Sequence, residues 1–250
     1  MNRTSGHRLL CAPLFAVLLT LASSVAHADQ WTTPTPEELS MTAQPEVPGA
    51  AAVYLFREET TEDDLHMFSV YVRLKVLTEA GKERGNVELK YASFTDSVGF
   101  SVDNIEGRTI HSDGTVIPFT GKPYQKLVEK NRGVKVMAKV FSMPDVQIGS
   151  IIEYRYKLHY DDQYYVPPSW YIQSDFFTRK AHYVWKPTGR DLTSSRGVVS
   201  TIAWFPILPA GTELQHSELP PQGFRPAQKV FEVNAHDIPP SPSEDHMPPI

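Results

Sequence analysis

Residues 66–77 read HMFSVYVRLKVL, and this stretch decides the fold class of the chain. Every even position from 68 to 76 is apolar, whereas the odd positions from 69 to 75 hold a serine, a tyrosine and two cations. Successive side chains of a β-strand point to opposite faces, so a period of two gathers the apolar set on one side. The stretch therefore predicts a half-buried strand with a polar outer face.

The sequence around this strand repeats the pattern. Residues 79–82 (EAGK) are followed by a second alternating run at 87–91, which predicts an antiparallel hairpin with Gly81 at a positive φ. Asp113-Gly114 separates two short apolar runs and signals a tight turn. Further strands are expected at 134–140, 152–160, 170–173, 182–185, 201–205 and 229–233.

Short strands separated by glycine and proline are typical of an all-β fold. We expect an antiparallel β-sandwich or open barrel over residues 51–235, with little helix. One helical turn is expected after Thr35, and Tyr124 to Lys130 is ambiguous. Proline-rich sequence flanks the domain, with an extended leader at 29–50 and a linker or tail at 236–250.

Residues 1–28 are organised like a secretory signal peptide. Arg3 and Arg8 precede an apolar run at 9–22, which is too short to span a bilayer. A small-x-small triplet at 26–28 then predicts cleavage after Ala28. We therefore expect an exported protein, periplasmic or secreted, with no membrane span after cleavage.

Cleavage would change the composition in two ways. The remaining 222 residues would carry 22 basic and 29 acidic side chains, a net charge of −7, which argues against nucleic acid as a partner. The chain would also lose Cys11, its single cysteine, so no disulfide could form. A disulfide-free domain of this size must be stabilised by its hydrophobic core.

Five segments stand out in their order along the chain: 48–53 (PGAAAV), 72–81 (VRLKVLTEAG), 105–114 (IEGRTIHSDG), 141–146 (FSMPDV) and 148–156 (IGSIIEYRY). In that order they resemble the family called domain of unknown function 3857, from about Trp31 to the C-terminus. The resemblance implies an exported bacterial domain that usually precedes a transglutaminase-like domain, but it implies no agreed activity. The sequence stops at Ile250, so a stand-alone form, a split gene and a truncated sequence are all open.

The residues give little support to catalysis. A transglutaminase-like reaction requires a thiolate with a histidine partner, and the mature chain would have no cysteine. Residues 99–103 come nearest to a serine-hydrolase motif but lack its final glycine, and no glycine-rich phosphate loop is present. We therefore predict that the protein is not an enzyme, with no catalytic residues and no cofactor.

Two polar groups could still serve a metal or acid–base chemistry. His159 and Asp161, beside Asp162, could face one ion, but a polar strand end that enters a turn is the simpler interpretation. Acidic runs such as Glu58-Glu59 and 62–64 could act on a glycoside, although solvated charge is the default interpretation of such turn-like, polar sequence. We therefore predict no metal site.

The densest aromatic group lies between residues 154 and 171. Alternation explains the tyrosines at 154, 156 and 160 as the core side of one strand. The aromatic residues that alternation does not explain are Tyr164, Tyr165, Trp170 and Tyr171. Aromatic rings on a β-face can stack on sugars or grip a peptide, so these four residues are the candidate ligand or partner surface.

Two functions are therefore expected. The first is an exported, non-enzymatic module that docks on or positions a partner, such as a transglutaminase-like domain or protein. The alternative is a carbohydrate- or peptide-binding protein whose Tyr164–Tyr171 surface holds a cell-wall glycan or peptide.

Overall fold

The computed structural model describes residues 31–94, 99–161, 166, 168–188, 192–193, 199–200, 206–208, 211–221, 223 and 227–241. The chain divides into two units, Met1–Thr33 and Pro34–Ile250, and every element below belongs to the second. The predicted signal peptide lies outside the described residues. Within them, no helix has the length and apolar character needed to cross a membrane.

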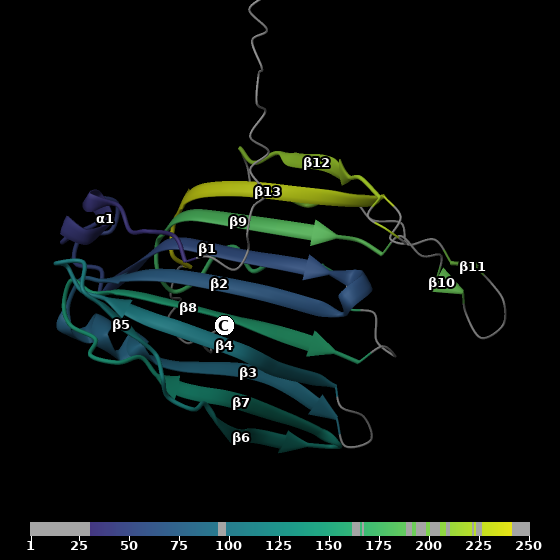
Figure 1. Cartoon of the computed structure of the whole chain (residues 1–250), viewed down its shortest axis with the longest axis horizontal. Helices are drawn as coiled ribbons and strands as arrows, with labels where there is room; N and C mark the ends of the chain where they lie inside the picture. Colours follow the sequence, from purple (N-terminus) through teal and green to yellow (C-terminus); the bar gives the residue numbers. More distant parts are fainter. Residues whose placement is uncertain are drawn as a thin grey trace, which may run out of the picture. The chain divides into compact units, whose positions relative to one another are not determined.

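The described part of the chain consists mainly of strands (Figure 1). The strands are β1 (Ala52–Glu62), β2 (Met67–Val76), β3 (Asn86–Phe94), β4 (Phe100–Ile110), β5 (Val116–Pro118), β6 (Tyr124–Asn131), β7 (Val134–Ser142), β8 (Ile151–Tyr160), β9 (Thr178–Lys186), β10 (Leu192–Thr193), β11 (Val199–Ser200), β12 (Leu214–Leu219) and β13 (Gln228–Ile238). The helical elements are α1 (Pro36–Ser40) and the 3₁₀ turns η1 (Asp63–Leu65) and η2 (Glu79–Gly85).

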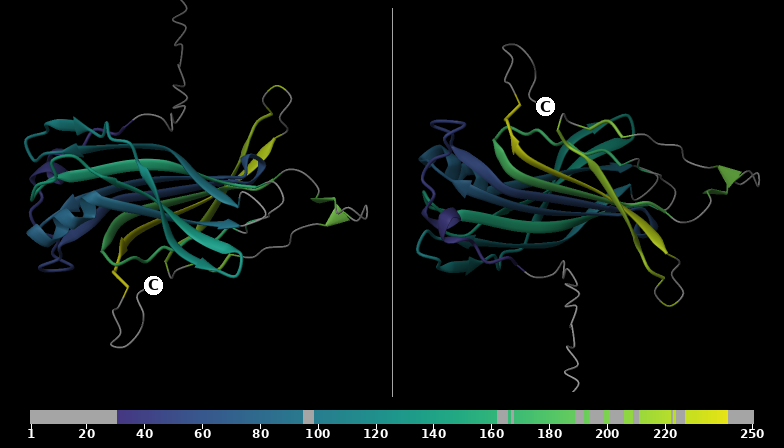
Figure 2. Two further views of the ribbon diagram at one scale, coloured as in Figure 1. Left: turned by 90° about the horizontal axis from the view of Figure 1, so that it is seen from below. Right: turned by 90° about the horizontal axis from the view of Figure 1, so that it is seen from above.

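Eight strands form one sheet in the order β12-β13-β9-β1-β2-β8-β4-β5, and three form a second in the order β3-β7-β6. The β10 and β11 strands pair with each other as a separate ribbon. Neighbours are antiparallel except β1 and β9, which run parallel. Figure 2 shows that the strands at the two ends of the molecule run in clearly different directions, as expected for twisted sheets. The expected all-β, mainly antiparallel, sandwich-like fold is confirmed.

An apolar layer joins the two sheets. Leu74 of β2 and Ile152 of β8 belong to the same buried cluster as Leu89 of β3 and Phe141 of β7. Each large aliphatic side chain in such a layer contributes about 1.5–3 kcal/mol when it is fully buried. A second cluster lies on β9 and β13, around Tyr183. Among the described residues, the layer shared with the small sheet is therefore built from β1, β2, β8 and β4 of the large sheet, and β9-β13 has a core of its own.

The prediction of a hairpin at Gly81 is wrong. Residues 79–85 form the 3₁₀ turn η2, and the strands on either side enter different sheets. Gly81 does not adopt a positive φ; a Cβ atom on it would lie 2.1 Å from the carbonyl oxygen of Ala51. Glycine is required because another backbone segment approaches closely, which a local turn pattern cannot indicate.

The polar face predicted for residues 66–77 is also corrected. Arg73 and Lys75 are 5% and 0% exposed, so the end of β2 is buried on both faces. The segment around α1 covers the second face. It is the helical turn expected after Thr35, and a capping box joins Thr35 and Glu38 at its start. Lys75 Nζ donates to the carbonyl oxygen of Leu39 at 2.8 Å, which satisfies the buried ammonium group.

The remaining strand predictions divide into three groups. The turn at Asp113-Gly114 is confirmed, with Gly114 at φ 87° between β4 and β5. The ambiguous segment Tyr124 to Lys130 is a strand, β6, and 182–185 and 229–233 lie in β9 and β13. Residues 170–173 are not a strand, and 201–205 lie outside the described residues.

Candidate functional site

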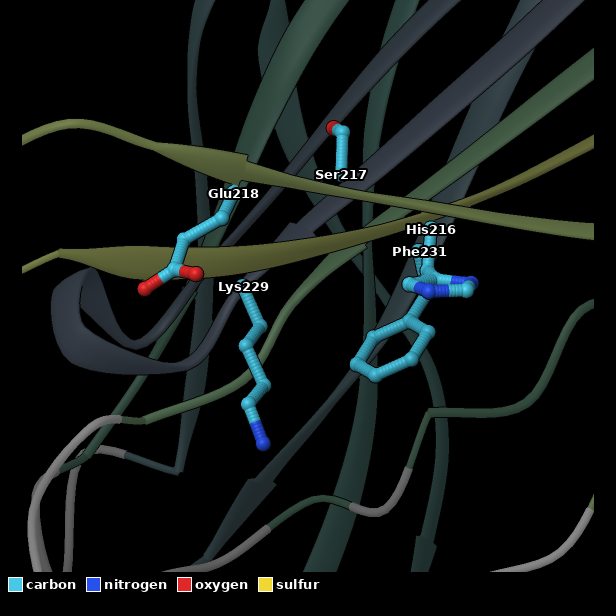
Figure 3. Close-up of a pocket in the computed structure, with 5 residues that line it drawn as sticks. All are labelled: His216, Ser217, Glu218, Lys229 and Phe231. Carbon is cyan, nitrogen blue, oxygen red and sulfur yellow. The ribbon is translucent and has the colours of Figure 1, made fainter.

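A hollow of about 390 Å³ opens at the β12 end of the large sheet. The described residues that line it come from two neighbouring strands: His216, Ser217 and Glu218 from β12, and Lys229 and Phe231 from β13. In Figure 3 the side chains of Glu218, Lys229 and Phe231 point to one side of the strands, while the hydroxyl of Ser217 points to the other.

The register of β12 and β13 explains why these side chains meet. His216 is paired with Phe231, and Glu218 with Lys229, so the four residues form two neighbouring rows on one face. The first row places an imidazole beside a phenyl ring. The second places a carboxylate opposite an ammonium group. The hollow thus offers an aromatic surface with both signs of charge at its rim.

The aromatic side of the hollow packs on a buried tryptophan. The Phe231 ring stacks on Trp185 of β9, with ring centroids 5.4 Å apart and an interplanar angle of 29°. Trp185 Nε1 in turn donates a hydrogen bond to Asp63 Oδ2 at 3.1 Å. Asp63 is only 5% exposed, and burial raises the pKa of its carboxyl group. Phe231 is therefore positioned by a chain of contacts that reaches the end of β1.

The outer edge of this site is open among the described strands. β12 is the terminal strand of the large sheet, and β13 is its neighbour on the inner side. Five of the six residues of β12 are exposed. A terminal strand presents backbone N–H and C=O groups that can pair with another extended chain. An aromatic hollow beside an open strand edge can bind an extended peptide through its backbone and one apolar side chain.

The four aromatic residues proposed from the sequence are not all placed together. Tyr164 and Tyr165 lie outside the described residues. Tyr171 is 77% exposed, whereas its neighbour Trp170 turns inward and packs on Tyr183, with ring centroids 5.3 Å apart. Trp170 thus belongs to the core of β9 and β13, and Tyr171 alone of the described pair faces solvent.

The surroundings of Trp170 contain polar groups with unusual environments. Trp170 Nε1 and the hydroxyl of Tyr183 are buried, and neither has a hydrogen-bond partner. Glu59 of β1 is the cross-strand partner of Tyr183. Burial raises the pKa of Glu59 to about 7, against the opposing effect of the Arg57 guanidinium. These groups lie on the same face of the large sheet as Phe231.

On the opposite face of β9, His182 bridges two carboxylates. Its Nδ1 lies 2.8 Å from Glu58 Oε2, and its Nε2 lies 3.1 Å from Glu232 Oε2. The hydrogen bond with Glu58 and then that with Glu232 raise the pKa of His182, although burial opposes them. Glu58 and Glu59 are therefore not a solvated pair in a turn, as the sequence suggested. They lie in the middle of β1, and their side chains point to opposite faces of the sheet.

A buried charged cluster lies on that same outer face, on β2, β8 and β4. Glu153 is 0% exposed and accepts hydrogen bonds from Arg73, Arg108 and the hydroxyl of Tyr71. Arg73 Nη1 also pairs with Glu38 of α1 at 3.1 Å. This arrangement neutralises every member of the cluster and fixes the α1 segment on the sheet, which is a structural role.

The sequence suggested that His159, Asp161 and Asp162 could face one ion. His159 Nε2 lies 3.4 Å from Asp103 Oδ1 of the neighbouring strand, and Asp162 lies outside the described residues. Within the part of the chain that the structure describes, no three His, Cys, Asp or Glu side chains are grouped to hold a metal ion.

Sequence reasoning did not find the β12–β13 hollow. The segment 214–219 alternates leucine, histidine and glutamate with polar residues, which is a weak strand signal. His216 stands alone in the sequence, and only the pairing with β13 brings it to Phe231. The alternation of β13 was visible, but its partner strand was not.

The chain matches a family model described as "Domain of Unknown Function with solved-structure structure (DUF3857)" over residues 62–242. It is also similar in fold to a crystal structure described as that of "a putative protease from Parabacteroides distasonis ATCC 8503". The TM-score is 0.51 at 16% sequence identity, over 79% of this chain and 38% of that one. The chain thus spans well under half the length of that protein. No curated protein matches the chain.

Proposed function

The chain belongs to the DUF3857 family, and on this premise we propose that it is an exported, non-enzymatic module that holds a segment of a partner polypeptide at its β12–β13 hollow. The observation that carries the proposal is the stacked and supported Phe231 ring beside a terminal strand. A transglutaminase-like domain or protein is the proposed partner, because the sequence resemblance implies one.

The electrostatics of the hollow favour an extended peptide as its occupant. The open edge of β12 supplies backbone donors and acceptors, which pair with any extended main chain. Phe231 and His216 offer a surface for one apolar or aromatic side chain, and Glu218 and Lys229 can each pair with a charge of the opposite sign. Such a site would select a sequence without acting on it.

The similar solved structure supports a role beside other domains. In that structure the shared fold accounts for 38% of the chain, so the rest of that protein lies outside the shared region. A β-domain that positions a neighbouring domain needs a surface for it, and the hollow beside the open edge of β12 is such a surface.

Selection from a displayed library of random peptides tests the proposal. We expect the full-length exported protein to enrich peptides that bind wild type but not Phe231→Ala, while Tyr171→Ala retains them. Equal binding to wild type and Phe231→Ala would overturn the proposal. Because Phe231→Ala removes core contacts, thermal unfolding of the variant must be measured, and the exposed substitution Glu218→Lys provides a second test that leaves the core intact.

The non-enzymatic part of the proposal has its own test. The purified protein is incubated with unfolded casein and with peptidoglycan, and the products are analysed by mass spectrometry. We expect both substrates to be recovered intact. Turnover that follows the protein through purification would contradict this part, even if the peptide site were confirmed.

The second candidate function is carbohydrate binding at the Tyr171 surface. Its one supporting observation is the 77% exposure of Tyr171, which leaves the ring available for stacking. Titration with cell-wall glycans, followed by tryptophan fluorescence, separates the two functions. A response that Tyr171→Ala abolishes and Phe231→Ala preserves would favour this candidate.

A further inference from the structure

The hairpin of β6 and β7 concentrates positive charge on an otherwise acidic protein. Residues 122–139 contain six basic side chains and one acidic side chain, Glu129. The basic residues are Lys122, Lys126, Lys130, Arg132, Lys135 and Lys139. The chain has a formal net charge of −5, and this segment contributes +5, so the rest of the chain sums to −10. The hairpin is therefore a separate electrostatic feature.

Few of these charges are used within the fold. Of the six cations, only Lys126 forms an ion pair with another described residue, at 3.1 Å from Glu88 of β3. All eight residues of β6 are exposed. Lys122 and Arg132 are exposed as well, whereas Lys135 and Lys139 of β7 are half-buried. Most of the positive charge therefore faces solvent, where it can attract a partner of opposite charge over about a Debye length, ~8–10 Å at ordinary salt.

The hairpin even places like charges against each other. Lys130 of β6 is the cross-strand partner of Lys135 of β7, and the turn that joins the strands adds Arg132. Arg132 adopts a φ of 41°, followed by Gly133 at 87°, as a tight hairpin turn requires. Like charges directly opposite each other destabilise a strand pair. A destabilising arrangement at an exposed position points to a role outside folding.

Protection of a sheet edge does not account for all six basic residues of the hairpin segment. Lysines on a terminal strand discourage unwanted pairing, and this could explain Lys126 and Lys130 on β6. Lys135 and Lys139 lie on β7, which is the central strand of the small sheet and has partners on both sides. Their charges therefore do not protect an open strand edge.

The hairpin also exposes apolar surface and an open strand edge. Tyr124 and Leu127 of β6 are 60% and 52% exposed, and Val134 at the start of β7 is 36% exposed. β6 is the terminal strand of the small sheet, at the opposite end of the molecule from β12 in Figure 1. An apolar strand edge among cations fits an extended chain that alternates acidic and apolar side chains.

We propose that the β6–β7 hairpin is a second docking surface, which binds an acidic extended segment of a partner polypeptide as an added strand on β6. The acidic side chains of that segment face Lys130 and Lys135, which share one face of the hairpin, and its backbone pairs with the open edge. This surface is independent of the β12–β13 hollow, so either can fail without the other.

The probe is a synthetic peptide of the length of β6 that alternates Glu and Val, with binding to the full chain measured by fluorescence anisotropy. Two control peptides carry Lys in place of Glu, or a central Pro that removes a backbone donor. We expect the acidic peptide to bind, its affinity to fall as salt is added, and both controls to fail. Equal binding of the proline peptide would overturn the added-strand geometry.

The variant Lys130→Glu separates binding from folding. It places a carboxylate opposite Lys135 and so removes a repulsion, which should leave the thermal unfolding midpoint unchanged or higher. We expect peptide affinity to fall about tenfold, equivalent to about 1.4 kcal/mol. The control Lys180→Glu makes the same change of net charge on exposed β9 sequence and should leave affinity within about twofold.

Two results would overturn the proposal. One is an equal loss of affinity in Lys130→Glu and Lys180→Glu, which would show attraction by net charge alone. The other is binding to phosphatidylglycerol vesicles, sensitive to Lys130→Glu, without binding to the acidic peptide. That second result would assign the hairpin to an anionic membrane surface instead.

Discussion

Phe231 and Trp185 stack with ring centroids 5.4 Å apart, and Trp185 Nε1 donates to the buried carboxylate of Asp63. This contact joins an exposed hollow on β12 and β13 to the end of β1. The same sheet face holds a second tryptophan, Trp170, which is partly buried and whose shielded Nε1 has no hydrogen-bond partner. The two tryptophans differ in this hydrogen bond and in burial, since Trp185 is 4% exposed, and the effect on stability can be measured.

Trp185→Phe should destabilise the protein more than Trp170→Phe. The first substitution leaves Asp63 with one hydrogen-bond donor fewer in a buried position, at a cost of about 1–3 kcal/mol. The second removes a buried N–H group that is already unpaired, so the loss of indole volume is the main cost. Urea unfolding of both variants, compared at one pH, measures the difference. Equal destabilisation would show that the bond to Asp63 contributes nothing.

His182 should make the stability of the protein depend on pH. Its raised pKa means that the folded state favours the charged imidazolium, held by Glu58 and Glu232. This stabilisation is complete below the unfolded pKa of about 6.5 and is lost as pH rises through the higher folded pKa. Urea unfolding across this range should show a decline that is smaller in His182→Gln. Parallel curves for the two proteins would exclude the bridge as its source.

The ionisation of Glu59 should also lower the stability of the protein as pH rises, but over a lower pH range. Burial raises its pKa from 4.5 to about 7, so its contribution is complete below about 4.5 and is lost as pH rises towards 7. Glu59→Gln removes the ionisation and should be more stable than wild type at pH above 7. The neighbouring Glu58→Gln, on the other face, should be less stable, because it removes a partner of His182.

That pair of variants is a sharp test of the strand register. If β1 placed both carboxylates in solvent, the two substitutions would have equal and small effects. A loss of stability in Glu58→Gln below pH 6.5, where His182 is charged, together with a gain in Glu59→Gln above pH 7, requires that one side chain faces His182 and the other faces the buried aromatic layer.

Glu153→Gln should be strongly destabilising, by about 3–5 kcal/mol, because it leaves Arg73 and Arg108 without their buried counter-charge. Glu106→Gln is the matched control. It breaks the pair of Glu106 with Arg155 between the same two strands, where the carboxylate is 54% exposed, and should cost less than about 1 kcal/mol. Chemical denaturation of both proteins gives the comparison, and similar losses would contradict the buried cluster.

The sequence predicts the fold class because alternation is a local property. The run at 66–77 and the turn at Asp113-Gly114 each contain their own signal, and both appear in the structure. The errors arise where distant segments meet. Lys75 is polar in the sequence, but α1 covers it, and the carbonyl oxygen of Leu39 accepts its hydrogen bond. Gly81 is required by the close approach of the Ala51 carbonyl.

The candidate site was harder to predict than the fold for the same reason. Phe231 lies in a recognisable strand, but its role depends on the register with β12 and on the stack with Trp185. The parallel pairing of β1 with β9, which brings Asp63 near Trp185, spans more than a hundred residues of sequence. Aromatic density along the chain pointed to 164–171, where Trp170 instead completes a core.

Backbone hydrogen exchange tests the central claim most directly. A peptide selected on the wild-type protein is added, and amide exchange is followed by mass spectrometry with and without it. We predict slower exchange in β12 (Leu214–Leu219), where the peptide pairs with the open edge, and no such change in Phe231→Ala. Protection that appears around Tyr171 and leaves β12 unchanged would contradict the account.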